Sequence, residues 1–251
     1  IPTDSAANAD VILINTCSIR EKAEQKVFSL LGSLREEKKR NPELLLGVTG
    51  CVAQQEGEQI RERMPHVDLI VGTQQIYRLP EMLSRLSSKT TTREIATNLE
   101  DAFVIPPFQK LLSTAPPSPA PPNFQRFVTI MQGCNNFCSY CVVPGTRGRE
   151  ISRPVADILE EVEILVSQGV KEITLLGQNV NSYGQTNTVA GGTVTFPDLL
   201  RQVAAVKGLK RLRFTTSHPK DLSDELMRCF AELDNLCPHF NLPVQSGSKR
   251  I

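Results

Sequence analysis

The feature that most constrains this fold is the alternation of short apolar runs with longer amphipathic stretches. Residues 11–15 (VILIN), 44–48 and 67–71 have the length and apolar character of buried strands. Between the first two, residues 20–40 repeat apolar side chains at helical spacing. Because successive strand–helix–strand units make right-handed crossovers, this part of the chain is predicted to form an open parallel sheet.

The same alternation returns in the second half of the chain. Strands are predicted at 127–131, 170–176, 211–215 and 240–244, and helices at 153–168, from 197 onward and at 221–233. Four such steps without a closing strand indicate part of a β/α barrel. The expected fold class is therefore α/β, with an N-terminal open parallel-sheet domain followed by a partial β/α barrel.

A proline-rich segment separates the two halves. Residues 106–122 hold seven of the 17 prolines, a composition typical of an extended, semi-rigid linker. The predicted domains are therefore 1–105 and 123–251, with the linker at 106–122.

Composition excludes several classes of protein. A hydrophobic content of 40% excludes a chain that is disordered throughout, and no run approaches the roughly 18 apolar residues of a membrane span. Residues 1–10 show no signal peptide. The net charge of +1 gives no overall basic footprint of nucleic-acid binding, although it leaves room for a local basic groove. Seven cysteines, an odd number, favour thiols in a reducing compartment, so we expect a cytoplasmic protein without a membrane partner.

Three of the cysteines form a compact motif. Cys134, Cys138 and Cys141 have the spacing C-x3-C-x2-C, directly after a predicted strand. A structural zinc site needs four ligands, usually in two pairs, and no histidine lies nearby in the sequence. An iron–sulfur cube held by three thiolates keeps one iron open to a ligand. Zinc binding and a chance group of core cysteines remain the two alternatives.

The residues around this motif resemble a known family. Residues 133–149 (GCNNFCSYCVVPGTRGR) are similar to the cluster loop of the radical S-adenosylmethionine superfamily, in its methylthiotransferase branch. Further segments that resemble the same family are NTCSIREKAEQKVF (15–28), GCVAQQEG (50–57), TLLGQNVNSYG (174–184), RFTTSHP (213–219) and LPVQSGS (242–248). The resemblance covers nearly the whole chain apart from the linker and residues 185–196, and it implies that the second domain is a partial radical S-adenosylmethionine β/α barrel.

The resemblance implies two 4Fe–4S clusters. Cys134, Cys138 and Cys141 match the ligands of the radical cluster, whose open iron binds S-adenosylmethionine and whose electron cleaves it to a 5′-deoxyadenosyl radical. Cys17 and Cys51 match two ligands of an auxiliary cluster that donates sulfur. The family's third auxiliary cysteine lies upstream of these residues, so we expect this cluster to be incomplete here. The later barrel strands and the RNA-binding TRAM domain of the family are also absent, which suggests a truncated chain.

The implied reaction is the methylthiolation of tRNA. Sulfur and a methyl group are added at C2 of N6-isopentenyladenosine beside the anticodon, and flavodoxin or ferredoxin supplies the electron. Relatives within the family modify threonylcarbamoyl-adenosine in tRNA or an aspartate of a ribosomal protein instead. The alternative outside enzymes is a zinc-stabilised RNA-binding module.

Other polar residues are candidates for cofactor contacts. Tyr140 precedes the third cysteine and matches an aromatic position near the adenine, although it equally suits a residue that covers the cluster. Gln178, Asn179 and Ser217 follow predicted strands, where barrel enzymes bind ligands. Three further candidates, Arg147, Arg149 and Arg153, suit contacts with tRNA phosphates or a cofactor carboxylate, or else solvated surface charge. The family has histidine where this chain has Asn241, so no role is carried over to that position.

Overall fold

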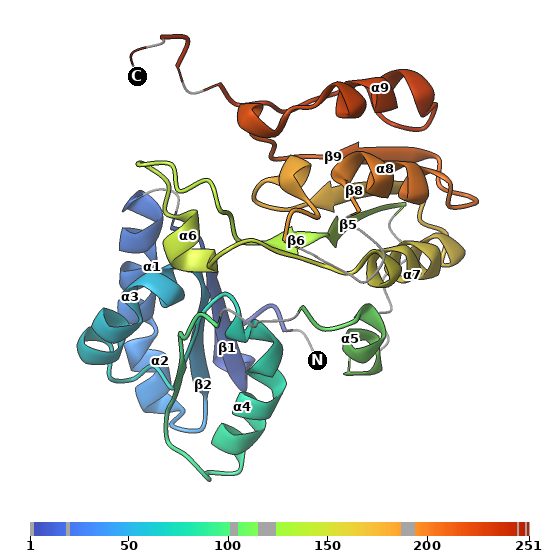
Figure 1. Ribbon diagram of the computed structural model, residues 1–251. Coiled ribbons are helices and arrows are strands. Elements are labelled where there is room, and N and C mark those ends of the chain that lie inside the picture. Colours follow the sequence, from blue (N-terminus) through green and yellow to red (C-terminus); the bar gives the residue numbers. More distant parts are fainter. Residues whose placement is uncertain are drawn as a thin grey trace. The chain divides into compact units, whose positions relative to one another are not determined.

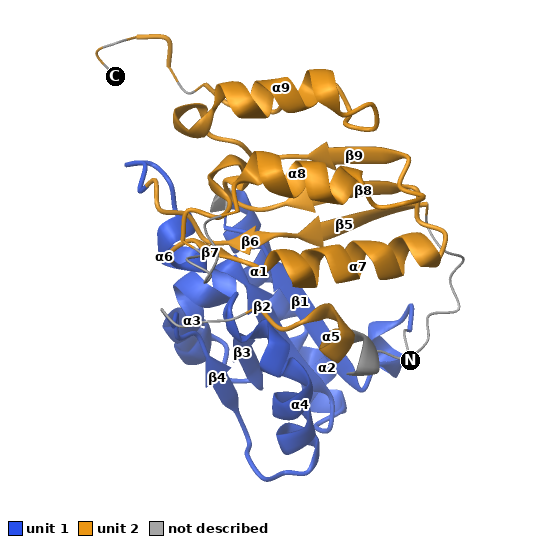
Figure 2. Ribbon diagram, turned by 45° about the vertical axis from the view of Figure 1, so that its right-hand side comes forward, with its two compact units in different colours: residues 1–103, 137–148 blue, residues 104–136, 149–251 orange. Residues whose placement is uncertain are grey.

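The protein divides into two α/β units. The computed structural model describes residues 3–18, 21–100, 105–114, 124–186, 194–244, 246–248 and 250. Figure 1 shows the helices and strands along the chain. Unit 1 comprises residues 1–103 and 137–148, and unit 2 comprises residues 104–136 and 149–251 (Figure 2). Each unit contains its own parallel sheet, which confirms the predicted fold class. No helix within the described ranges is long and apolar enough to cross a membrane.

Unit 1 is an open sheet with the strand order β1-β2-β3-β4, all parallel. Its strands are β1 (Val11–Thr16), β2 (Leu45–Gly50), β3 (Leu69–Val71) and β4 (Glu94–Ala96). Its helices are α1 (Glu21–Ser33), α2 (Arg35–Arg40), α3 (Cys51–Arg63), α4 (Leu79–Ser87) and α6 (Val143–Arg147), with 3-10 turns η1 (Ala6–Asn8) and η2 (Gln75–Arg78). The first three strands were predicted. The fourth was missed because its three residues (EIA) lie among polar residues and form no apolar run.

Side-chain alternation on these strands builds two cores in unit 1. Leu46 and Val48 of β2 pack with α1 and α3 on one face of the sheet. On β3, Leu69 and Val71 pack with α4 on the other face. Because successive strand residues point to opposite faces, an open sheet of this kind requires helices on both sides.

Unit 2 has a three-stranded parallel sheet with the order β5-β8-β9. Its strands are β5 (Gln125–Thr129), β8 (Glu172–Leu176) and β9 (Arg211–Phe214), and a short antiparallel pair is formed by β6 (Met131–Gln132) and β7 (Ile151–Ser152). Its helices are α5 (Phe108–Thr114), α7 (Val155–Ser167), α8 (Phe196–Ala204) and α9 (Asp224–Glu232), with 3-10 turns η3 (Val180–Ser182) and η4 (Pro219–Asp221). The three long strands run in one direction, and β6 and β7 lie beyond their carboxyl ends (Figure 2).

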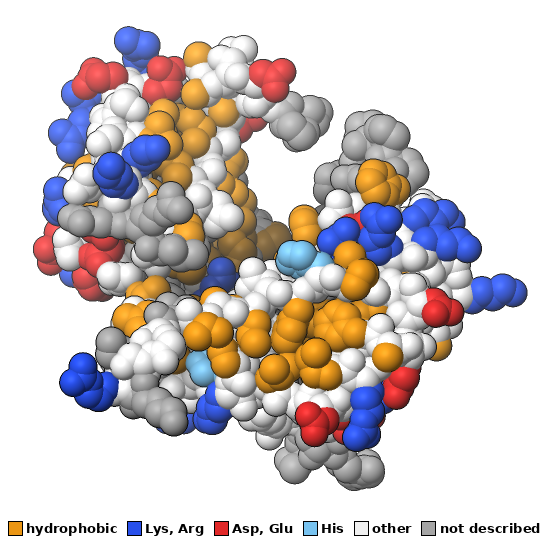
Figure 3. Space-filling view, turned by 90° about the horizontal axis from the view of Figure 1, so that it is seen from above, with side chains coloured by type: hydrophobic (Ala, Val, Ile, Leu, Met, Phe, Trp, Pro, Cys, Tyr) orange, Lys and Arg blue, Asp and Glu red, His pale blue; other side chains and the backbone are white. Residues whose placement is uncertain are grey.

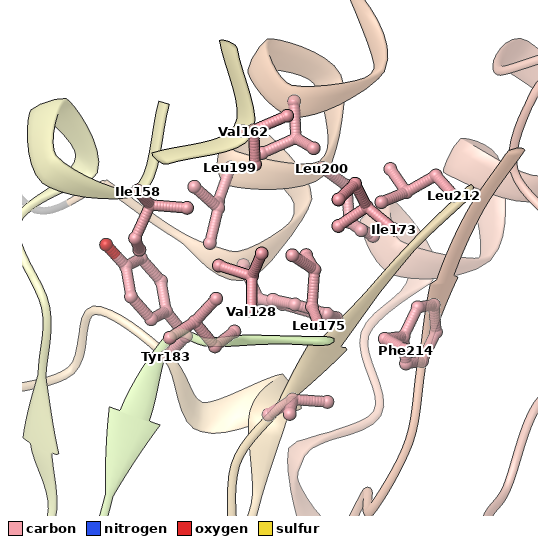
Figure 4. Packing of buried hydrophobic residues seen from close by; sticks show 14 of the residues in the cluster. Val128, Ile158, Val162, Ile173, Leu175, Tyr183, Leu199, Leu200, Leu212 and Phe214 are labelled. Atoms are coloured by element: carbon pink, nitrogen blue, oxygen red, sulfur yellow. The ribbon is translucent and has the colours of Figure 1, made fainter. Parts of the chain in front are cut away.

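One face of the unit 2 sheet carries the main core. Val128, Ile173 and Leu212 project from the strands onto the apolar sides of α7 and α8, where Val162 and Leu199 meet them (Figure 4). All five side chains are fully buried, and each such burial stabilises the fold by roughly 1.5–3 kcal/mol.

The face of the unit 2 sheet that points away from α7 and α8 is more exposed to solvent. Phe127 of β5 is 61% exposed. Figure 3, which views the molecule from above Figure 1, shows a patch of hydrophobic side chains with charged groups at its border.

Two predictions about backbone structure were wrong. The first was that residues 106–122 form an extended linker. Phe108–Thr114 instead forms the helix α5, and its sequence contains no proline. Pro106 and Pro107 precede the helix, where a missing N–H costs nothing. Residues 115–123 lie outside the described residues.

The second error was a final strand at 240–244, which has no strand structure. Instead, Leu212 of β9 forms a single parallel bridge with Leu236. Phe240 packs its ring against Phe214 and Phe230, so its apolar character reflects side-chain burial rather than a strand.

Candidate functional site

Cys17 and Cys51 follow the last paired residues of two neighbouring strands. Thr16 and Gly50 are register partners at the carboxyl ends of β1 and β2, and each is directly followed by a cysteine. Cys17 is exposed, whereas Cys51 begins α3 and is 8% exposed. Both cysteines therefore emerge at the carboxyl edge of the unit 1 sheet, where open parallel sheets bind ligands.

The threonine before Cys17 connects the two strand ends. The Thr16 hydroxyl donates to the carbonyl oxygen of Thr49 (2.6 Å) and accepts from the backbone N–H groups of Val52 (3.1 Å) and Ala53 (3.4 Å). It thereby caps the first turn of α3, whose own N-cap residue, Gly50, has no side chain. Sequence reasoning missed this role because the capping residue lies on another strand.

Gly50 is required by the same arrangement. Its φ of +92° is a conformation that side chains disfavour, and an added Cβ would lie 2.4 Å from the carbonyl oxygen of Thr16. Only glycine permits this close approach of β1 to the start of α3.

Two cysteines of the triplet belong to the segment 137–148 of unit 1. The N–H of Cys141 donates to the carbonyl oxygen of Cys138 (2.9 Å), so the pair spans a tight turn. Tyr140 between them is 67% exposed, and loss of hydration, followed by the neighbouring Cys138 thiol, raises the pKa of its phenol. The segment is fastened to the rest of unit 1, since the Thr73 hydroxyl donates to the carbonyl oxygen of Thr146 (2.6 Å).

Cys134, the first cysteine of the triplet, lies in unit 2 and is partly exposed. The residue before it, Gly133, has φ +78° and donates its N–H to Oε1 of Gln178 (2.7 Å). Gln178 therefore holds the start of the cysteine loop against the end of β8. The position of Gln178 after a strand predicted a contact with the cofactor, and this contact remains a prediction.

Asn179 and Ser217 are buried at the carboxyl ends of β8 and β9. Asn179 is 2% exposed and donates from Nδ2 to Asp221 (2.7 Å), while its Oδ1 has no hydrogen-bond partner among the described residues. The Ser217 hydroxyl is likewise buried without a partner in the part of the chain that the structure describes. Thr216 beside it has φ +70°, which is strained for a β-branched residue, and its carbonyl oxygen accepts from Val180 N–H (2.9 Å). Buried unsatisfied polar atoms beside a strained residue are typical of ligand sites.

Glu150 is a further polar residue of this region, and sequence analysis did not identify it. It is 5% exposed, its Oε2 accepts from the Ser182 hydroxyl (2.5 Å), and its N–H donates to Oδ1 of Asn135 (3.1 Å). Burial, with a smaller contribution from the Asp221 charge, raises the pKa of Glu150 to about 7. No pattern in the sequence distinguishes this carboxylate from a surface charge.

The arginines that follow the cysteines have different environments. Arg153 is 4% exposed, donates to Oε2 of Glu161 (2.6 Å) and to the carbonyl oxygen of Thr129 (2.6 Å), and is therefore a structural ion-pair residue. The interpretation of Arg153 as a contact to RNA or cofactor was wrong because the side chain turns into the core of unit 2. Arg149 is exposed and Arg147 half-buried. Asn241 is exposed.

The donor set suits an iron–sulfur centre by its chemistry. Across the described ranges, no group of three or more His, Cys, Asp or Glu side chains is close enough together to hold a metal ion. The match between these residues and an iron–sulfur cluster rests on residue type and spacing: three cysteines lie within eight residues, and cysteine thiolates are the usual ligands of such clusters. A cavity of about 360 Å³ lies at the opposite, amino-terminal edge of the unit 1 sheet, beside Asp10, Lys38 and Asp68, and contains none of the predicted site residues.

Comparisons with protein families agree with the two halves of the chain. Residues 2–72 match the Uncharacterized protein family UPF0004, and residues 128–251 match the Radical SAM superfamily. The chain is 60% identical to the tRNA-2-methylthio-N(6)-dimethylallyladenosine synthase of Desulfotalea psychrophila, covering 100% of this chain and 56% of that protein. It is 50% identical to the protein of the same name from Syntrophotalea carbinolica, covering 99% of this chain and 54% of the relative. The chain thus spans about half the length of the curated relatives it matches.

Solved structures support the fold. The radical S-adenosylmethionine methyltransferase TsrM from Kitasatospora setae superposes with a TM-score of 0.62 at 16% identity, covering 96% of this chain and 49% of that one. The cobalamin-dependent S-adenosylmethionine radical enzyme OxsB gives 0.57 at 14% identity, covering 96% of this chain and 36% of that one. With both halves matched and 60% identity to a named relative, the chain belongs to the methylthiotransferase family of the radical S-adenosylmethionine superfamily.

Proposed function

We propose that this chain is the cluster-binding part of an enzyme that methylthiolates isopentenylated adenosine in tRNA. The observation that carries the proposal is the cysteine triplet, which directly follows β5 and β6 at the carboxyl end of a parallel sheet. Ligand and catalytic groups gather at this end in β/α barrels. The names of the relatives support the choice of substrate.

Cys134, Cys138 and Cys141 are proposed to hold a 4Fe–4S cluster, and Tyr140, Gln178, Asn179 and Ser217 to surround S-adenosylmethionine. The buried Oδ1 of Asn179 and the Ser217 hydroxyl lack partners among the described residues, which fits polar groups reserved for a ligand. When bound, the cluster and S-adenosylmethionine supply one-electron chemistry that no side chain provides. The protein's own part is to position these groups and to exclude water.

Cys17 and Cys51 are proposed as ligands of an auxiliary 4Fe–4S cluster that provides sulfur. Their support is the register of β1 and β2, which brings both cysteines to one sheet edge. Neighbouring strands lie about 5 Å apart, a spacing that one cluster can bridge. The two proposed functional domains are residues 1–105 for the auxiliary cluster and 123–251 for the radical cluster.

The proposed partners follow from this chemistry. The substrate is tRNA that carries N6-isopentenyladenosine beside the anticodon, and the electron donor is flavodoxin or ferredoxin. Both place the reaction in the cytoplasm.

The test is anaerobic reconstitution with iron and sulfide, followed by reduction with S-adenosylmethionine present. We expect a brown protein that contains acid-labile sulfide and releases 5′-deoxyadenosine, and a Cys138→Ala variant that releases none. Mass analysis of nucleosides from isopentenylated tRNA, treated with protein of the relatives' full length, then identifies the product. Stoichiometric zinc without iron would instead support an RNA-binding module, and modified threonylcarbamoyl-adenosine would identify a different substrate.

A further inference from the structure

Thr73, which follows β3 at the carboxyl edge of the unit 1 sheet, forms hydrogen bonds with two different helices. Its N–H donates to Oε1 of Gln54 (3.2 Å), and its hydroxyl donates to the carbonyl oxygen of Thr146 (2.6 Å). Gln54 lies on α3 and Thr146 on α6. A single residue between β3 and η2 therefore connects two helices that are distant in the sequence.

Each of these two helices adjoins a proposed cluster ligand. α3 begins with Cys51, whereas α6 begins two residues after Cys141. The N–H of Cys141 donates to the carbonyl oxygen of Cys138 (2.9 Å), so a second ligand belongs to the same tight turn. Thr73 thus links the helix of the proposed sulfur source to the loop that carries two ligands of the proposed radical cluster, all within unit 1.

Close packing supports this link on both sides. On the α3 side, an added Cβ at Gly72 would overlap Oε1 of Gln54, so glycine leaves room for the amide that receives the Thr73 N–H. On the α6 side, Gly148 has φ +79°, and an added Cβ there would lie 3.0 Å from Nε2 of Gln74, a buried residue. The loop after β3 therefore packs against α3 and against the end of the segment 137–148.

The proposed reaction requires a fixed relation between the two cysteine groups. It uses a radical from one cluster and sulfur from the other, and a displacement of about 1 Å can lower a rate about a hundredfold. Loops at a sheet edge have few backbone hydrogen bonds of their own, so they open locally unless side chains hold them. The hydroxyl of Thr73 supplies such a bond to the segment 137–148.

We propose that Thr73 is a positioning residue that holds the loop of Cys138 and Cys141 at a fixed position relative to Cys51. The inference rests on the proposed function and adds a residue that no sequence motif indicated. The hydrogen bonds of Thr73 go to α3 and α6, so it acts through these helices. Without its hydroxyl, the segment 137–148 moves against α3, and radicals form without leading to sulfur insertion.

The first measurement needs no cofactor. Amide hydrogen exchange of residues 137–148 is followed by mass spectrometry on the metal-free chain, for the parent protein and for Thr73→Val, which keeps the side-chain shape but lacks the hydroxyl donor. We expect exchange in this segment to become roughly fivefold faster, the equivalent of one lost hydrogen bond. Thr73→Ser retains the hydroxyl and should exchange within about twofold of the parent.

Two variants control for a general loss of stability. Thr92→Val makes the same substitution at an exposed threonine, and Thr16→Val removes a hydroxyl that caps α3. Both should leave exchange of residues 137–148 within about twofold of the parent. Thr73→Ala removes the Thr73 hydroxyl with a smaller side chain and should behave as Thr73→Val does, which keeps the test valid if the valine disturbs packing.

The second measurement uses protein of the relatives' full length, reconstituted and reduced with S-adenosylmethionine and isopentenylated tRNA. The readout is the ratio of methylthiolated tRNA to 5′-deoxyadenosine, because a loss of folded protein lowers both products equally and leaves the ratio unchanged. We expect Thr73→Val to lower this ratio roughly fivefold or more, with 5′-deoxyadenosine release within about twofold of the parent. Thr73→Ser should restore the ratio.

Equal exchange of residues 137–148 in the parent and in Thr73→Val would overturn the inference, and so would an unchanged product ratio. Exchange that is accelerated as much by Thr16→Val as by Thr73→Val would overturn it as well. These three results leave the proposed function intact. A full-length parent protein that releases no 5′-deoxyadenosine would remove the proposed function, and the inference with it, even if Thr73→Val accelerates exchange.

Discussion

The hydroxyl of Thr16 accepts a hydrogen bond from the backbone N–H of Val52 at 3.1 Å, although the two residues lie 36 positions apart. This contact fastens the end of β1, which leads into Cys17, to the helix that begins with Cys51. The geometry of the proposed auxiliary site thus depends on a hydroxyl that is not itself a ligand.

Replacing that hydroxyl should destabilise unit 1. Thr16→Val keeps the shape but removes the cap of α3 and the donor to Thr49, at a cost of about 1–2 kcal/mol. Thr16→Ser should restore most of the loss, and Thr92→Val, at an exposed threonine, is the control. Urea unfolding measures all three variants; equal stability of Thr16→Val and the parent protein would contradict the capping role.

Gly50→Ala should be more damaging than a typical glycine substitution. Its Cβ would meet the Thr16 carbonyl oxygen at 2.4 Å in a backbone conformation with φ +92°. We expect a loss above roughly 2 kcal/mol in thermal or urea unfolding. Gly32→Ala, in α1 with open space around the new methyl group, should be neutral or stabilising by up to about 1 kcal/mol. The same loss at both glycines would show that strain at Gly50 is not the cause.

The ion pair between Arg153 and Glu161 should matter for folding. Nη1 and Oε2 are 2.6 Å apart, with side-chain exposures of 4% and 10%. Glu161→Gln leaves a buried guanidinium without its counter-charge, so we expect a loss of about 3–5 kcal/mol in urea unfolding. Glu43→Gln, which breaks the exposed pair with Lys89, should cost less than about 1 kcal/mol. If the two variants lose the same small amount, Arg153 has no structural role in the core.

The buried carboxyl of Glu150 should make stability depend on pH. Its pKa is about 7 in the folded chain against an ordinary value of 4.5, so the unfolded chain loses this proton at lower pH than the folded chain does. As pH rises from about 4.5 to 7 the folded state loses stability, and the penalty is complete above about 7. Glu150→Gln removes this titration.

The stability of Glu150→Gln relative to the parent, both without ligand, should therefore rise between pH 5 and pH 8 by about 3 kcal/mol. Urea unfolding at several pH values measures the difference. Glu163→Gln, at an exposed position, should show almost no such trend. A difference for Glu150→Gln that is constant across pH would contradict the raised pKa.

Cys17 and Cys51 at the end of the unit 1 strands should separate the two halves of the proposed reaction. In protein of the relatives' full length, a Cys17→Ala, Cys51→Ala double variant should still release 5′-deoxyadenosine but form no methylthiolated tRNA. Cys237→Ala, which lies outside both cysteine groups, should leave both products unchanged. Methylthiolation at the parent rate by the double variant would exclude Cys17 and Cys51 as ligands of the sulfur source.

Local patterns in the sequence predicted most of the architecture. Short apolar runs and helical periodicity identified β1, β2, β3, β5, β8 and β9 and most of the helices, because each pattern is complete within one segment. The spacing of Cys134, Cys138 and Cys141 indicated an iron–sulfur loop for the same reason. β3 is also short but lies in an apolar run, whereas β4 (Glu94–Ala96) and β7 (Ile151–Ser152) lie among polar residues and form no such run.

The tertiary structure determined which polar residues are buried, which are ion-paired and which cap a helix. Arg149 and Arg153 lie four positions apart in one basic stretch, yet Arg149 is exposed and Arg153 is buried against Glu161. No pattern in the sequence marks Glu150 as a buried acid. Nor does any pattern mark Thr16, at the end of β1, as the cap of α3, the helix that follows β2. The sequence by itself determined which segments form strands, helices and a thiol-rich loop, since these depend on neighbours along the chain. Burial, charge pairing and capping depend on groups distant in sequence, and only the folded chain brings those groups together.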